Sequence, residues 1–115
     1  MFDFQKLNVY TKSIQFHIDC KILMAGLKNE KHVADQLSRA SQSIPLNIAE
    51  GSGKFSKPDR KNYFKTARAS LFECISILEI LDAEGKIEKQ VCDKQIAIGD
   101  EISRMLFTMI RNLQV

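Results

Sequence analysis

Residues 56–85 read SKPDRKNYFKTARASLFECISILEILDAEG, and this stretch decides the fold. It opens with a hydroxyl group suited to an N-cap, a proline in the first turn and an acid three residues after the cap, which are Ser56, Pro58 and Asp59. Apolar residues then recur at helical spacing: Tyr63, Ala67, Leu71, Cys74, Leu78 and Leu81. Gly85 ends the pattern, so we predict one long helix over about residues 56–83.

Three more segments show the same periodicity, and we predict helices over about residues 4–27, 31–50 and 88–113. The predicted helix over residues 31–50 has one apolar line: Val33, Leu37, Ala40, Ile44 and Ile48. Pro45 should bend or divide the second of these, because proline removes a backbone donor and clashes with the preceding turn. No window alternates as a half-buried strand does. We therefore expect an all-α fold, an antiparallel up-down-up-down four-helix bundle with a proline bend in helix two.

The chain has 115 residues, which is enough for one hydrophobic core, and we predict a single domain over residues 1–115. No apolar run approaches the roughly 18 residues that a membrane span needs. The segment from Met1 to Lys6 has an early acid and lacks the order of a signal peptide. We expect a cytoplasmic protein without membrane contact.

The first predicted helix has two apolar faces on opposite sides. We expect one to face the core: Leu7, Tyr10, Ile14, Ile18, Ile22 and Ala25. The other consists of Val9, Phe16, Cys20, Leu23 and Leu27.

The fourth predicted helix also has more apolar residues than one core needs. Its core line is expected to be Val91, Ile98, Ile102, Met105, Met109 and Leu113, with Cys92, Ile96, Phe107 and Ile110 beside it. A monomer cannot cover all these surfaces, so we predict a homo-oligomer. The expected interface residues are Val9, Phe16, Leu23, Leu27, Phe72, Ile96 and Phe107. The alternative is that loops or irregular packing cover them.

Charge is distributed unevenly although the net charge is only +3. Residues 54–68 have a balance of +5, and their basic residues are Lys54, Lys57, Arg60, Lys61, Lys65 and Arg68. Residues 69–101 have a balance of −5. Such asymmetry attracts phosphate or docks the opposite patch of another copy, and both interpretations remain open.

Four of the basic residues share one face of the third helix, Lys57, Lys61, Lys65 and Arg68, and Phe72 follows on the same line. A basic stripe that ends in an aromatic ring can follow a phosphate backbone and stack on one base. We therefore predict a nucleic-acid surface formed by all six basic residues. The alternative is a solvated face with Phe72 at a subunit interface.

The sequence contains no recognisable catalytic or metal-binding arrangement. Cys20, Cys74 and Cys92 are far apart and are expected to be small buried residues. His17 and His32 lack acidic or thiol partners at ligand spacing. We expect a non-enzymatic protein without metal or cofactor.

The run SIPLNIAEGSG over residues 43–53 resembles the signature of the 23S rRNA intervening-sequence proteins, also labelled as a ribosomal protein family. The similarity extends along nearly the whole chain. The matching motif residues are Ser43, Pro45, Asn47, Ile48, Ala49, Glu50 and Gly51. Ala69 stands where the family usually has glycine, and Cys74 and Ile75 stand where a second acid is common.

This resemblance implies an antiparallel bundle that assembles into a ring, commonly a pentamer. It also implies a link to interrupted large-subunit ribosomal RNA, and a related group accompanies reverse transcriptases of diversity-generating retroelements. We expect a homo-oligomer that binds RNA or DNA through the third helix. The alternative is a protein-interaction scaffold, such as a reverse transcriptase partner, that makes no nucleic-acid contact.

Overall fold

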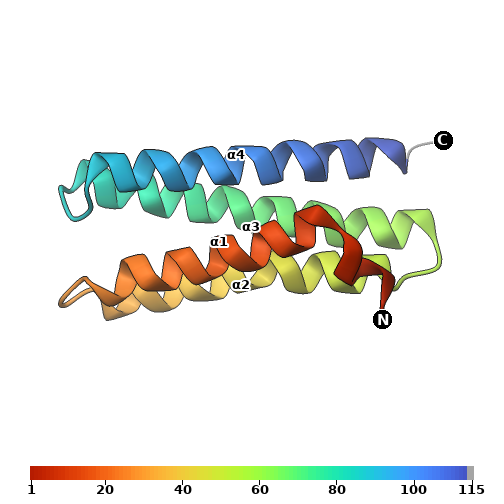
Figure 1. Ribbon diagram of the computed structural model, residues 1–115, viewed down its shortest axis with the longest axis horizontal. Coiled ribbons are helices and arrows are strands. Elements are labelled where there is room, and N and C mark those ends of the chain that lie inside the picture. The colour runs from red at the N-terminus through yellow and green to blue at the C-terminus, as the bar shows by residue number, and fades with distance from the viewer. Residues whose placement is uncertain (114–115) are drawn as a thin grey trace.

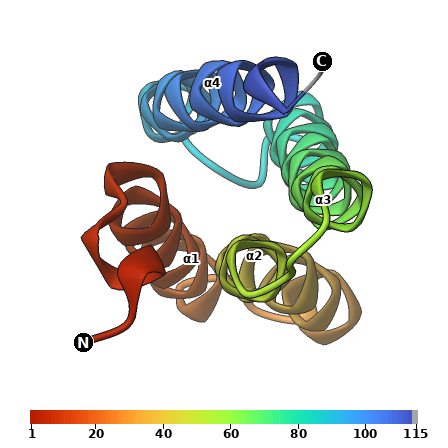
Figure 2. The same cartoon turned by 90° about the vertical axis from the view of Figure 1, so that its right-hand side faces the viewer.

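The computed structural model describes residues 1–113, which form four long helices and one short turn of helix. The elements are η1 (Asp3–Lys6), α1 (Asn8–Ala25), α2 (Lys31–Ser52), α3 (Lys57–Ala83) and α4 (Lys89–Asn112). The helices lie side by side along the long axis (Figure 1), and Figure 2 shows them around a common centre in chain order. Residues 1–113 contain no strand, which confirms the predicted all-α four-helix fold.

The two ends of α3 lie where the sequence predicts them. Ser56 Oγ accepts a hydrogen bond from the backbone N–H of Asp59 at 3.2 Å and so caps the first turn. After the last turn, Gly85 adopts a φ of +72°, a left-handed conformation that glycine adopts without steric cost. Lys86 N then donates to Leu81 O at 2.9 Å, which satisfies a terminal carbonyl.

The ends of the first two helices differ from the prediction. Leu7 is extended and separates η1 from α1, so the first long helix begins at Asn8 and not at residue 4. α2 continues through Gly51 to Ser52. It is also one continuous helix through Pro45, so the predicted division does not occur, while the bend stays a prediction.

The core is formed by one line of side chains from each helix. The lines predicted for α2 and α3 are confirmed at their central positions, since Leu37, Ile44, Leu71 and Leu78 are each 0% exposed. Burying side chains of this size stabilises the fold by roughly 1.5–3 kcal/mol each. The remaining buried aliphatic residues of these two helices are Ala40, Ile48, Ala67, Ile77 and Leu81.

α1 turns the opposite face to the core from the one expected. Val9 and Phe16, predicted at a subunit interface, are 2% and 0% exposed because the chain's own core covers them, so that prediction is wrong. Leu23 and Leu27 are half-buried against the same core. The face predicted to be internal leaves Ile18 and Ile22 exposed on the outside, while the other face places the bulky Phe16 ring inside.

α4 matches the prediction in part, since Ile98, Met105 and Met109 of its predicted line are half-buried against the core. Val91 is exposed, whereas Cys92 and Leu106 are buried beside Ile102, which was correctly expected inside. The core also contains a polar residue that helical periodicity did not predict, Gln95. Its side-chain amide donates to the Phe16 carbonyl at 3.0 Å and contacts Cys20 Sγ at 3.3 Å, so the buried donor is satisfied.

Within residues 1–113, no helix combines the length and the apolar character that crossing a membrane requires.

Candidate nucleic-acid interface

The six basic residues predicted to bind nucleic acid lie around the first half of α3, and the structure divides them into two groups. Arg60 and Lys54 form the first group and make contacts within the chain. Arg60 donates from Nε to Lys54 O at 2.9 Å and from Nη2 to Ser52 O at 3.1 Å. The ammonium of Lys54 lies 5.1 Å from the centre of the Tyr63 ring. This pair therefore holds the α2–α3 connection in place.

Lys57, Lys61 and Lys65 recur at intervals of about one turn along one side of α3, and Lys65 lies beside Phe107 and Ile110 of α4. Lys57 and Lys65 are exposed, and Lys61 is half-buried. No carboxylate in residues 1–113 forms an ion pair with any of the three. Their positive charge is therefore not neutralised within the described part of the chain.

Arg68 continues this line and lies against two aromatic rings. Its guanidinium carbon is 4.6 Å from the centre of the Phe72 ring and 5.6 Å from that of Phe107, distances at which cation–π attraction acts. Its Nε is buried and has no acceptor among the described residues. The basic stripe, which we define as Lys57, Lys61, Lys65 and Arg68, thus ends at a pair of rings from two different helices.

A surface cavity of about 280 Å³ lies at this end of the basic stripe, and we refer to it as the aromatic hollow. Phe72 and Phe107 form its apolar walls and are 52% and 51% exposed. Its other lining residues are Lys65, Arg68, Ala69 and Ile110. Ala69 is exposed in this hollow. It occupies the position where the 23S rRNA intervening-sequence proteins, which the sequence resembles, usually have glycine.

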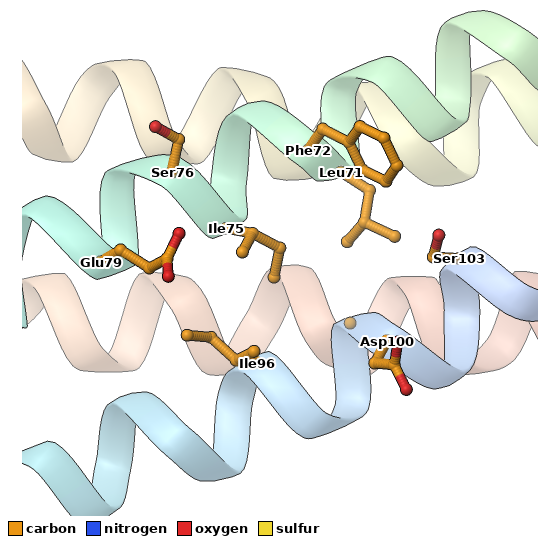
Figure 3. Close-up of a pocket in the computed structure, with 9 residues that line it drawn as sticks. Leu71, Phe72, Ile75, Ser76, Glu79, Ile96, Asp100 and Ser103 are labelled. Carbon is orange, nitrogen blue, oxygen red and sulfur yellow. The ribbon is translucent and has the colours of Figure 1, made fainter.

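A second cavity continues along α3 and α4 beyond Phe72, and we refer to it as the acidic hollow. It measures about 230 Å³, and Figure 3 shows the side chains of both helices around it. Its apolar lining is Leu71, Phe72, Ile75, Ile96 and Gly99, and its polar rim is Ser76, Glu79, Asp100 and Ser103. Asp100 pairs with Arg104 at 2.9 Å. The two hollows differ in the sign of the charge beside them.

Gly99 lines the acidic hollow at a close approach of α4 to α3, and helical periodicity did not predict its role. A Cβ at this position would lie 2.7 Å from Ile75 Cδ1 and 3.3 Å from Leu71 Cδ1. The only signal in the sequence is a glycine inside a predicted helix, which often marks a close approach. Ile96, predicted at a subunit interface, is half-buried beside it.

The residues of the family motif lie in α2, and several of them make its contact with α3. Asn47 Nδ2 donates to Ser43 O at 2.8 Å and to Ser43 Oγ at 2.9 Å. Ser43 Oγ in turn lies 2.9 Å from Ser70 Oγ on α3. Pro45, Ile48 and Gly51 are buried, Ala49 is half-buried and Glu50 is exposed. The buried members of the motif therefore serve helix packing.

The three cysteines and His17 lie away from the basic stripe and pack within the bundle. All three cysteines are buried as predicted. Burial raises the pKa of Cys20 to about 11 and also raises the pKa of Cys74 and Cys92, so their thiols stay protonated and unreactive at neutral pH. Burial and the nearby Lys21 lower the pKa of His17, whose Nδ1 lies 2.7 Å from Ser41 Oγ. No group of three or more potential metal ligands occurs in residues 1–113.

Residues 5–108 match the sequence profile of the 23S rRNA-intervening sequence protein family. The fold resembles that of a protein of unknown function from the S23 ribosomal protein family of Bacteroides thetaiotaomicron, with 27% sequence identity and a TM-score of 0.82. This similarity covers 89% of the present chain and 97% of that protein. No curated protein matches the chain. Because the profile spans nearly all of the four helices, the chain belongs to the 23S rRNA-intervening sequence protein family.

Proposed function

We propose that this protein is a non-enzymatic homo-oligomer that binds RNA or DNA through the basic stripe on α3. The observation that supports this proposal is the set of three lysines, Lys57, Lys61 and Lys65, which recur on one face without a carboxylate partner in residues 1–113. Regularly spaced, unneutralised cations release counterions from a phosphate backbone, which is the main source of sequence-independent affinity. The name of the family makes large-subunit ribosomal RNA the first ligand to test.

A salt titration of RNA binding tests the electrostatic part of this proposal. The variant carries Lys57→Glu, Lys61→Glu and Lys65→Glu, and its affinity at low salt should fall at least about tenfold. The slope of the logarithm of affinity against the logarithm of salt concentration should fall by about 3, one unit for each lost phosphate contact.

The matched control changes the same charge elsewhere, with Lys21→Glu, Lys28→Glu and Lys94→Glu. These three lysines are exposed and form no ion pair in residues 1–113. The control should lose much less affinity, because only long-range attraction changes. Equal losses in the two triple variants, or unchanged affinity in the first, would contradict the basic stripe as the binding surface.

The oligomeric part of the proposal rests on the outward face of α1. Ile18 and Ile22 are 42% and 67% exposed one turn apart, and the half-buried Ile14 precedes them on the same face. Exposed apolar side chains that adjoin one another in a patch mark a candidate surface for contact with another subunit. We propose that copies of the chain meet through this face and form a ring. The number of subunits, five, is what the family resemblance implies.

Light scattering after size exclusion tests the assembly. The wild type should elute with several times the 13.1 kDa of one chain, and Ile22→Glu should lower that mass. Leu46→Glu, at an exposed position on α2, is the matched control and should keep the assembled mass. A wild-type protein that stays at 13.1 kDa at micromolar concentration would refute the proposed assembly.

A second candidate function, an interaction scaffold such as a reverse transcriptase partner, is favoured by the acidic hollow. Glu79 and Asp100 lie beside its apolar floor, an arrangement that suits a segment with one apolar side chain and flanking basic residues. A synthetic peptide of that kind should bind the wild type and bind the Glu79→Gln, Asp100→Asn variant more weakly. If the peptide binds while no RNA or DNA binds, the scaffold function is the better one.

A further inference from the structure

The basic stripe ends at the aromatic hollow, and this juxtaposition specifies the class of nucleic acid. We infer that the protein prefers single-stranded nucleic acid and places one unpaired base against Phe72 and Phe107, beside the Arg68 guanidinium. This inference rests on the proposed function, because it describes the ligand of the same surface. It adds a strand preference and a base-binding position that the positive charge of the stripe does not imply.

The two rings are placed for contact with a flat ligand. Phe72 on α3 and Phe107 on α4 are each about half exposed, so both keep ring surface available to solvent. Stacking a base on an aromatic side chain contributes about 1–3 kcal/mol and tolerates any base. A cavity of about 280 Å³ lies just below the range of roughly 300–1,000 Å³ typical of drug-sized ligands, which leaves room for a single base.

Arg68 supplies the second component of the site. Its buried Nε has no acceptor among the described residues, a condition that costs about 1–3 kcal/mol in a folded protein. The guanidinium also carries a positive charge beside the rings, which attracts the phosphates of a strand that reaches the aromatic hollow. Because the guanidinium already lies against both rings, the cation and the stacking surface are held together before any ligand binds.

A double helix cannot use this combination without disruption. Its bases are stacked on one another, so the rings of Phe72 and Phe107 could only meet a base that had left the stack, which costs a few kcal/mol. Lys57, Lys61 and Lys65 can contact the phosphates of either form. The aromatic hollow therefore favours the single strand, whereas the lysines favour neither form.

The acidic side chains beyond Phe72 limit the length of the contact. Lys57 and Phe72 are 15 positions apart on one helix, a distance of about 22 Å. Glu79 and Asp100 follow at the acidic hollow and repel phosphate. The strand should therefore run along the first half of α3 and leave the helix surface near the rings.

Binding is measured by fluorescence anisotropy with three probes: an oligothymidine of about 12 nucleotides, the same strand in a duplex, and the same strand with abasic sites. The wild type should bind the oligothymidine about tenfold more tightly than either other probe. The Phe72→Ala, Phe107→Ala variant should lose this advantage and keep its duplex affinity and its salt dependence. Ile80→Ala is the control, since Ile80 is 54% exposed on the same helix, two turns beyond Phe72, and does not line the aromatic hollow.

The outcomes separate the inference from the proposed function. If the triple lysine variant loses affinity while the double phenylalanine variant keeps its preference for the oligothymidine, the base site is wrong and the basic stripe stands. If the triple variant binds as the wild type does, the proposed function fails. Equal wild-type affinity for the abasic and the normal strand overturns the inference without any variant, so a folding defect cannot hide the answer. A double variant whose assembled mass falls would assign the rings to a subunit interface instead.

Discussion

α2 and α4 both pack against α3, but they meet it in different ways. On the α2 side, Gly51 brings the backbone of the helix against Phe64, and the hydroxyl groups of Ser43 and Ser70 are 2.9 Å apart. On the α4 side, Gly99 also removes a side chain, yet two cavities remain at the surface. Both glycines allow a helix to approach α3 closely. The result depends on the neighbouring side chains, because the space is filled beside Gly51 and partly empty beside Gly99.

The largest expected effect comes from filling the closed contact. A Cβ at Gly51 would lie 2.8 Å from Phe64 Cε1 and 2.9 Å from Tyr63 Cβ, and the latter atom cannot move without its backbone. Gly51→Val should therefore lower the free energy of unfolding by about 3 kcal/mol, as overpacked cores do. Urea denaturation measures this. Gly53→Ala is the control, because its added Cβ would make only ordinary contacts with α2 carbonyl oxygens, at 3.6 Å and 3.8 Å.

A smaller effect is expected at the open contact. The nearest atom to a Cβ at Gly99 is Ile75 Cδ1 at 2.7 Å, the far end of a flexible side chain that borders the acidic hollow. Ile75 can rotate into that space, and alanine gains roughly 1 kcal/mol of helix propensity over glycine. Gly99→Ala should change the free energy of unfolding by less than about 1 kcal/mol. A loss as large as that of Gly51→Val would mean that the two contacts of α3 are equally tight.

The smallest effect concerns the other side of α2, where His17 of α1 lies against Ser41. The pKa of His17 is lowered from 6.5, so the unfolded chain binds a proton more readily than the folded chain below pH 6.5. The stability that neutral His17 contributes is complete above pH 6.5 and is lost as the pH falls through the window below it. Urea denaturation of His17→Gln should show a weaker decline with acid than the wild type.

His32→Gln, an exposed position on α2, provides the comparison for that pH series. It should follow the wild type, because it leaves the contact between His17 and Ser41 intact. If His17→Gln also follows the wild type over the whole pH range, the contact between α1 and α2 does not depend on the protonation of His17.

The helical periodicity of the sequence predicted all four helices. It predicted the buried face correctly only where a helix has a single apolar face. α2 and α3 each have one, and their central residues Leu37 and Leu71 are buried as expected. α1 has two, and periodicity does not distinguish them. The choice depends on how well the Phe16 ring fits beside Gly99 of α4, which is a property of the packed bundle: a Cβ at Gly99 would lie only 3.4 Å from Phe16 Cε2.

The candidate site was predictable in its charge and not in its shape. Positions 57, 61, 65 and 68 share a helix face by arithmetic alone. The sequence could not show that Arg60 is used to hold backbone carbonyl groups, because Lys54 and Ser52 reach it only once the α2–α3 connection has formed. Nor could it place Phe107 beside Arg68, since these residues meet only when α4 has packed against α3.

The hydrogen bond from Gln95 to the Phe16 carbonyl joins residues 79 positions apart, and this spacing affects how the chain folds during synthesis. The ribosome adds roughly 5–20 residues per second, so α1 waits on the order of 10 s before α4 emerges to cover it. Throughout that interval α2 is the neighbouring helix already available to α1, and the α4 side of Phe16 and Cys20 stays uncovered. The nascent chain therefore exposes the apolar face of Phe16 and Cys20 early and covers it only after α4 has been synthesised.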